Sequence, residues 1–276
     1  MPVTTLSILR NTLPTLARLA GPLLSVALPD HCAVCHRRGA RQLCADCARI
    51  FDANRIDAPL RCGRCAIALP HGAGSPPEHE VAAPESATIC RISMSTATAI
   101  CGECLRQPPS FDATLALADY VAPLDTLMIR LKYHGALPLA REFGERLGDA
   151  LLPQQGDETP LLVPVPLAPS RLAARGFNQA WELARVAARR ANLPATAQGL
   201  RRERTTTPQR RLSRDARMRN LRDAFVASDR VRGRRIILVD DVMTTRATCD
   251  AAARALKDAG ASHVLAAVAL RTPPSR

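Results

Sequence analysis

One segment of the chain, residues 234–248, has the order of residue types that is typical of a strand, a loop and a helix in an α/β sheet. Residues 236–239 read Ile-Ile-Leu-Val, an apolar run without a polar break, as expected of a strand that is buried on both faces. Two carboxylates follow at its end, and then a run rich in hydroxyl groups. From residue 249 onward the apolar residues recur at helical spacing. The segment therefore predicts a central strand that leads directly into a helix.

The predicted turn between this strand and this helix has the chemistry of an anion site. The N–H groups of the loop and of the first helical turn lack internal partners, and the helix dipole favours negative charge there. Asp240 and Asp241 beside such a site suit a sugar phosphate, because carboxylates accept hydrogen bonds from neighbouring hydroxyl groups. An ordinary loop with acidic residues at a helix start is the alternative that these residues leave open.

Further strand and helix patterns alternate from Phe111 to the end of the chain. Strands are predicted over 114–121, 161–163 and 264–270, and helices are predicted from the apolar faces of 124–131 and 180–191. Alternation of this kind predicts an α/β domain over 111–276, with a mostly parallel sheet and flanking helices. Ligands of such sheets bind at the carboxyl ends of the strands.

Eight of the ten cysteines fall into four Cys-x-x-Cys pairs: Cys32 and Cys35, Cys44 and Cys47, Cys62 and Cys65, Cys101 and Cys104. Two residues between cysteines let both thiolates reach one metal ion, and two such pairs complete a tetrahedral zinc site. We predict two structural zinc ions with the pairs grouped in sequence order, and an interleaved grouping is the alternative. The predicted zinc module covers 31–110 with a flexible insertion at 66–100, and residues 1–30 are predicted to form a helical segment. Paired thiols of this type also indicate a reducing cytosol.

The formal net charge is +13, and part of it is concentrated in one segment. Arg201–Arg222 contains nine arginines and two acidic residues, which gives a net charge of +7. A segment this basic attracts phosphate groups, and binding of this kind is weakened by salt. A solvated basic loop is the alternative. The sequence has no apolar run of about 18 residues or more, so no membrane-spanning helix is predicted.

Residues 239–245, followed by Thr248, resemble the phosphoribosyl pyrophosphate (PRPP) loop of type I phosphoribosyltransferases. The resemblance implies that Asp240 and Asp241 hold the ribose hydroxyls, and that magnesium bridges the ribose oxygens and the pyrophosphate. It also implies a loop that binds the 5′-phosphate, made of Thr244, Thr245, Arg246, Ala247 and Thr248.

Arg246 departs from the pattern of that family, which usually has glycine at this position. Only glycine takes left-handed backbone angles without cost. If the loop needs a positive φ here, the arginine costs about 1–2 kcal/mol. The planar guanidinium could offset part of this cost by binding phosphate.

Zinc knuckles in front of a phosphoribosyltransferase-like domain resemble the ComF (competence protein F) family of bacteria. The local motifs that agree are Leu28-Pro29, Lys132–Gly135, Val163–Pro166, Arg175–Gln179, Thr207–Gln209 with Arg217 and Asn220, and the PRPP-like loop. By this resemblance, residues 164–166 bound the pyrophosphate loop, and Arg171 and Arg175 are candidate phosphate contacts. Arginine suits this role because its fork meets phosphate oxygens bidentately.

The resemblance implies a cytosolic protein that binds PRPP or a related sugar phosphate and acts in DNA uptake during natural transformation. Single-stranded DNA and DNA-uptake proteins are the implied partners. Two other interpretations stay open. One is an active phosphoribosyltransferase, which transfers the sugar to an unknown acceptor and releases pyrophosphate. The other is a non-catalytic protein of this fold whose zinc module binds nucleic acid or protein. Aromatic residues make up only 3% of the chain, which argues against a tight single-strand groove built on base stacking.

Overall fold

The computed structural model describes residues 31–38, 42–51, 59–70, 99–152, 158–203 and 224–274. The chain divides into two compact units, of which the first ends at Ile50 and the second begins at Phe51. Three predictions lie outside the described residues: the helical segment 1–30, the greater part of the insertion (71–98), and most of the basic segment (204–223).

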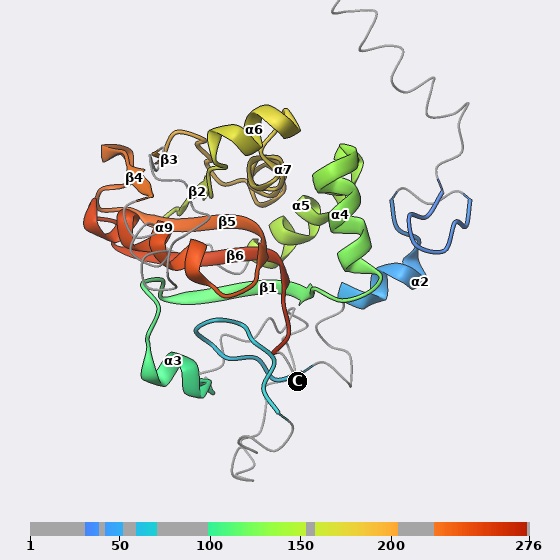
Figure 1. The fold of residues 1–276 in the computed structure, drawn as a ribbon, viewed down its shortest axis with the longest axis horizontal. Coiled ribbons are helices and arrows are strands. Elements are labelled where there is room, and N and C mark those ends of the chain that lie inside the picture. Colours follow the sequence, from blue (N-terminus) through green and yellow to red (C-terminus); the bar gives the residue numbers. More distant parts are fainter. Residues whose placement is uncertain are drawn as a thin grey trace, which may run out of the picture. The chain divides into compact units, whose positions relative to one another are not determined.

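The second unit is built on a sheet whose four described strands are all parallel and run in the order β1-β6-β5-β2 (Figure 1). These strands are β1 (Ala113–Asp119), β2 (Leu161–Pro164), β5 (Arg235–Met243) and β6 (His263–Arg271). A separate antiparallel pair is formed by β3 (Leu200–Arg202) and β4 (Phe225–Ala227). The predicted α/β architecture with a mostly parallel sheet is therefore confirmed.

Helices flank this sheet. In the second unit they are α3 (Gly102–Arg106), α4 (Leu124–His134), α5 (Leu137–Leu151), α6 (Pro169–Arg175), α7 (Gln179–Ala191), η4 (Asp229–Val231) and α9 (Ala247–Asp258). The first unit contains α2 (Ala45–Ala48), and a 3₁₀ turn, η1 (Arg49–Phe51), follows it. Helix α7 packs on β2 and β5, and α9 packs on β5 and β6. Helix α5 packs closely against α7, and Gly144 allows this close approach: a Cβ at this position would lie 2.6 Å from the Cβ of Val186.

The core on one side of the sheet joins α9 to a cysteine module. Ile236 and Leu238 of β5 belong to the same buried cluster as Ala252 and Leu256 of α9. Buried cysteines of the second unit complete this cluster, together with Phe111: Cys62, Cys65 and Cys104. The later half of the cysteine-rich region is therefore part of the hydrophobic core of the sheet unit.

Strand β5 is longer than the apolar run that predicted it. Pairing with β6 continues past the apolar residues to Met243, which lies opposite Arg271. Asp240 and Asp241 consequently lie within the strand, and the loop to α9 begins at Thr244. Among the described helices, none is long and apolar enough to cross a membrane.

Candidate functional site

The structure brings each predicted group of four cysteines together in sequence order. The sulfur atoms of each group all lie within 4.8 Å of one another. The first cluster consists of Cys32, Cys35, Cys44 and Cys47, and the second cluster consists of Cys62, Cys65, Cys101 and Cys104. The interleaved grouping is not the one found.

Both clusters are built from the same local backbone pattern. The turn after the first pair places one residue in the left-handed region, His36 at φ 58° and Ala66 at φ 54°. The second pair opens a short helix, with Cys44 as N-cap of α2 and Cys101 as N-cap of α3. These backbone turns aim the sulfur atoms of both pairs at one point in each cluster.

The sulfur geometry fits a tetrahedral metal ion. Zn–S bonds of about 2.3 Å correspond to S···S distances of about 3.8 Å in a tetrahedron. The Sγ atoms of Cys35 and Cys44 are 3.6 Å apart, and those of Cys65 and Cys101 are 3.8 Å apart. The Cys65 thiol and backbone N–H groups, including that of Cys101, hydrogen-bond the sulfur of Cys62 and lower its pKa to about 4, while the same bond between the thiols raises the pKa of Cys65. Cys62 therefore favours the thiolate, the form that binds zinc. Each cluster can therefore hold one zinc ion.

Asp240 and Asp241, the acid pair of β5, are buried, and not all of their carboxylate oxygens accept a strong hydrogen bond from the described residues. Asp240 Oδ1 accepts a hydrogen bond from the N–H of Asp241 at 2.9 Å, and Asp241 Oδ1 accepts one from the N–H of Val242 at 2.8 Å. Lys132 Nζ, from the end of α4, lies 2.8 Å from Asp241 Oδ2. That oxygen is buried and receives no hydrogen bond of good geometry from the described residues. It keeps accepting capacity for a ligand besides its ion pair with Lys132.

Positive charge surrounds this acid pair. Burial raises the pKa of Asp240 well above its ordinary value, and the charge of Asp241 adds to the rise, while Lys132 opposes it. Arg202, at the end of β3, has its pKa lowered by burial and by the charge of Arg171, and Asp240 opposes that shift. The predicted phosphate contact Arg171 of α6 therefore lies in the electrostatic range of Arg202 on β3, and Arg202 lies in that of Asp240 on β5. Arg202 was not predicted as a site residue, since in the sequence it belongs only to a basic run.

Arg175, the other predicted phosphate contact, is held by its neighbours. Its guanidinium donates to Gln179 Oε1 at 2.5 Å and lies 5.2 Å from the centre of the Tyr133 ring. Gly176 follows in the left-handed region at φ 80°, and Asn178 caps α7 while its amide donates to the carbonyl of Val165. The Arg175–Gln179 motif thus connects α6, α7 and the loop after β2.

The loop after β5 has a positive φ at Arg246, the condition under which the arginine is expected to be strained. Arg246 has φ 63° and ψ −11°, in the left-handed region, and is the N-cap residue of α9. Thr244 and Thr245 are exposed, and Thr248 lies in the first turn of α9 with Ala247. The Arg246 guanidinium does not line this loop: its Nη1 lies 2.8 Å from Cys104 Sγ in the second cluster. The predicted loop residues are therefore together, but the arginine side chain points to the cysteines.

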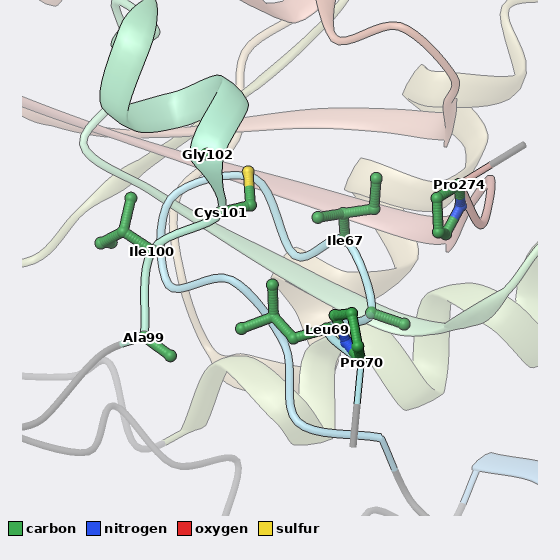
Figure 2. A pocket seen from close by; sticks show the side chains of 9 residues that line it. Ile67, Leu69, Pro70, Ala99, Ile100, Cys101, Gly102 and Pro274 are labelled. Carbon is green, nitrogen blue, oxygen red and sulfur yellow. The ribbon is translucent and has the colours of Figure 1, made fainter. Parts of the chain in front are cut away.

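An apolar cavity of about 560 Å³ lies on another part of the second unit (Figure 2). Figure 2 shows it between the knuckle that carries Ile67 and Leu69 and the residues before α3, with Pro274 at its edge. Its lining carries hardly any polar groups, in contrast to the charged edge of the sheet. The candidate functional site is therefore the charged edge of the sheet, with the acid pair Asp240 and Asp241, the nearby cationic side chains and the loop 244–248, and not this cavity.

Curated relatives resemble the chain over most of their own length. Competence protein F of Haemophilus influenzae is 33% identical over 171 residues, which cover 59% of this chain and 75% of that protein. The DNA utilization protein YhgH of Escherichia coli K12 is 34% identical over 168 residues, which cover 59% of this chain and 74% of that protein. No family model matches the sequence.

Among solved structures, the glutamine PRPP amidotransferase from B. subtilis, complexed with ADP and GMP, shows a TM-score of 0.34 and 22% identity. The match covers 46% of this chain and 26% of that chain, so it spans about a quarter of the solved protein. Because the alignment with the Haemophilus influenzae protein covers 75% of that relative at 33% identity, the chain belongs to the competence protein F family.

Proposed function

We propose that the protein binds PRPP, or a related sugar phosphate, at the carboxyl ends of β2 and β5. One observation carries this proposal: two adjacent buried carboxylates, Asp240 and Asp241, lie just before the hydroxyl-rich loop with a single cationic partner among the described residues, Lys132, at 2.8 Å from Asp241 Oδ2. Two buried carboxylates beside one cation are costly, and hydroxyl groups or a cation of the ligand would stabilise them.

The surrounding residues suit the parts of such a ligand. Ribose hydroxyls would donate to Asp240 and Asp241. The 5′-phosphate would bind the N–H groups and hydroxyls of 244–248 at the start of α9, where the helix dipole favours an anion. Arg171 and Arg202 would lie near the pyrophosphate, whose charge they match.

Magnesium fits the same donor set. Carboxylate oxygens are its preferred protein ligands, and it binds through one or two of them together with phosphate oxygens of a substrate. Asp240 Oδ2 and Asp241 Oδ2 are the oxygens with spare accepting capacity. Among the residues that the structure describes, the first contacts the Cys249 thiol at 3.9 Å and the second forms an ion pair with Lys132. Bound magnesium would neutralise the pyrophosphate and hold it beside the ribose.

Transferase activity is the enzymatic form of this proposal. A nucleophilic acceptor would form a bond to the anomeric carbon of PRPP while the bond from that carbon to pyrophosphate breaks, and pyrophosphate would leave with the electron pair. The chain would act by positioning and by stabilising charge. Binding without turnover is the alternative, and Arg246 favours it because type I phosphoribosyltransferases usually have glycine at this position.

The role in the cell that we propose is in DNA handling in the cytosol. The relatives are named for competence and for DNA utilization, and the chain has a net charge of +13, which favours contact with nucleic acid. Single-stranded DNA and DNA-uptake proteins would be the partners.

Titration calorimetry of the zinc-loaded protein with PRPP, with and without magnesium, tests this function. We expect binding that depends on magnesium and that falls about tenfold or more in Asp241→Asn, because this change keeps the shape and removes the charge. Asp149→Asn is the matched control, since Asp149 forms an exposed ion pair with Arg190 on α7. Equal PRPP affinity in wild type and Asp241→Asn would place the ligand elsewhere.

A further inference from the structure

Two arginines connect the loop after β5 with the second cluster. Arg246 occupies the last loop position before α9, and its side chain is only 13% exposed. Its Nη1 lies 2.8 Å from Cys104 Sγ, and its Nη2 lies 3.2 Å from Glu103 Oε1. The residue that sets the left-handed turn of the loop is therefore bonded through its side chain to a cysteine of the cluster.

Arg271, the last residue of β6, makes the second connection. It is 4% exposed, and its Nε donates to the carbonyl oxygen of Cys65 at 2.9 Å. Its Nη1 donates to the carbonyl oxygen of Met243 at 2.9 Å and also to that of Thr244. One buried guanidinium thus joins the knuckle of the second cluster to the end of β5 and to the first residue of the loop.

The charges at this junction are complementary when the cluster holds zinc. Four thiolates and one Zn²⁺ carry two negative charges in excess. Arg246, which also pairs with Glu103, and Arg271 place two guanidinium groups next to them, and among the described residues the hydrogen-bond acceptors of Arg271 are all carbonyl oxygens. A buried guanidinium without a compensating charge is destabilising. The metal centre and the two arginines therefore stabilise each other.

We infer that the second cluster, loaded with zinc, positions the sugar-phosphate loop through Arg246 and Arg271. The inference rests on the proposed sugar-phosphate site, and it makes the affinity of that site depend on zinc in the second cluster. Without zinc, the four sulfur atoms are no longer held in a fixed arrangement, and Arg246 loses its fixed contact with Cys104 Sγ and keeps only the ion pair with Glu103. The loop N–H groups then no longer converge on one phosphate, and affinity for the sugar phosphate falls. Arg246 and Arg271 are positioning residues in this account, because they act on the ligand through the loop.

Thermodynamic linkage relates the affinity for zinc to the affinity for PRPP. If zinc raises the affinity for PRPP by some factor, PRPP must raise the affinity of the second cluster for zinc by the same factor. Groups that hydrogen-bond the ligands of a metal typically change metal affinity by about 10–100-fold when they are removed. We therefore expect a reciprocal effect of about tenfold.

The test uses full-length chain in which Cys32→Ser and Cys35→Ser remove the first cluster, so that the one remaining metal reports the second. Zinc affinity is measured by chelator competition with and without PRPP, and PRPP affinity is measured by calorimetry with and without zinc. We expect both affinities to rise about tenfold in the presence of the other ligand. The cobalt-loaded protein gives a separate readout, because its sulfur-to-metal charge-transfer band should shift when PRPP binds.

The variant Arg246→Gln tests whether the bond between Arg246 and Cys104 carries this coupling. Arg106→Gln is the matched control. Arg106 bonds the same Glu103 carboxylate from an exposed position, so its replacement removes a guanidinium but leaves Cys104 untouched. Arg246→Gln should weaken zinc binding about tenfold and reduce the effect of PRPP on zinc to the part that Arg271 transmits, whereas Arg106→Gln should change neither. Zinc and PRPP affinities that are independent of each other in wild type overturn the inference. PRPP that does not bind zinc-loaded wild type overturns the proposed function instead, and the zinc affinities of the two variants then still test the bond between Arg246 and the cluster.

Discussion

The two adjacent carboxylates of β5 have different surroundings. Asp241 has Lys132 as a cationic partner at 2.8 Å, which compensates its charge. Asp240 has the N–H of Asp241 and the Cys249 thiol, and both burial and the charge of Asp241 disfavour its ionised form. A cation that binds between them would favour ionisation of Asp240. The pair is therefore an electrostatic cost in the free protein, and a magnesium–sugar phosphate complex would relieve it.

The raised pKa of Asp240 gives a stability that depends on pH. Between 3.8, the ordinary pKa, and the raised folded-state value, the unfolded chain releases a proton that the folded chain keeps. The free energy of unfolding therefore falls as pH rises through this window. Asp240→Asn removes this dependence, so the variant should gain stability relative to wild type as pH rises, and the gain should become constant above the raised pKa. Urea denaturation over a pH series measures it.

Asp258→Asn is the control for this series, because Asp258 is exposed at the end of α9. The control should follow the pH dependence of wild type. If Asp240→Asn also follows it, the Asp240 carboxylate ionises in the folded protein as it does in the unfolded chain.

In the loop between β5 and α9, one residue, Arg246, has both a strained backbone angle and specific side-chain bonds. Arg246 takes a left-handed angle that costs a residue with a side chain about 1–2 kcal/mol. Its bonds to Cys104 and Glu103 compensate, since they are made in a partly buried position. The departure from glycine is thus tolerated because the side chain has a specific partner.

Two substitutions separate these contributions. Arg246→Gly and Arg246→Gln both remove the guanidinium, but only the glutamine keeps the strained left-handed angle. Arg246→Gly should therefore be more stable than Arg246→Gln by about 1–2 kcal/mol, measured by urea denaturation in excess zinc. Equal stability of the two variants would mean that the loop leaves the left-handed region once the arginine is replaced.

The sequence predicted these elements to different degrees. The apolar run before Asp240 predicted β5, and the apolar face of 180–191 predicted α7. The partners of Arg246 and Arg271 could not be predicted, because Cys104 and Cys65 lie more than a hundred residues earlier and only the tertiary fold brings them close. Residue types and spacing indicate local chemistry, whereas bonds between distant elements depend on packing.

At the scale of the whole molecule, the two cysteine clusters belong to different compact units. The first cluster lies in the unit that ends at Ile50, and the second contributes Cys62, Cys65 and Cys104 to the core of the sheet unit. Removal of a metal should therefore have a local effect in the first case and a wide one in the second, because structural zinc contributes folding free energy directly.

We expect two zinc ions per chain by metal analysis of protein purified without chelator. Cys44→Ser should lose one ion and raise amide exchange in 31–51 more than in the sheet. Cys104→Ser should also lose one ion, but it should raise exchange in α9 and β6, because Cys104 packs in their core. Disulfides in place of metal, or the same exchange pattern in both variants, would contradict this division.

The net charge of the whole chain favours association with nucleic acid. The formal charge is +13, and eight thiolates with two zinc ions lower it only to about +9. Nine arginines between Arg201 and Arg222 concentrate this charge. With few aromatic rings for base stacking, we expect weak binding of single-stranded DNA with little sequence preference, dominated by the attraction of arginines to phosphates.

Salt dependence tests this last expectation. Changing Arg210, Arg211 and Arg214 to glutamine should make the slope of log affinity against log salt shallower by about 0.7 for each phosphate that is no longer neutralised, because fewer counterions are released. The matched control changes Arg141, Arg190 and Arg232, which removes the same total charge from arginines that are already paired with carboxylates. Fluorescence anisotropy with an oligonucleotide of mixed sequence measures both slopes. A similar decrease of slope in the two triple variants would mean that net charge alone attracts the DNA, whereas a decrease confined to the first variant assigns the binding to Arg201–Arg222.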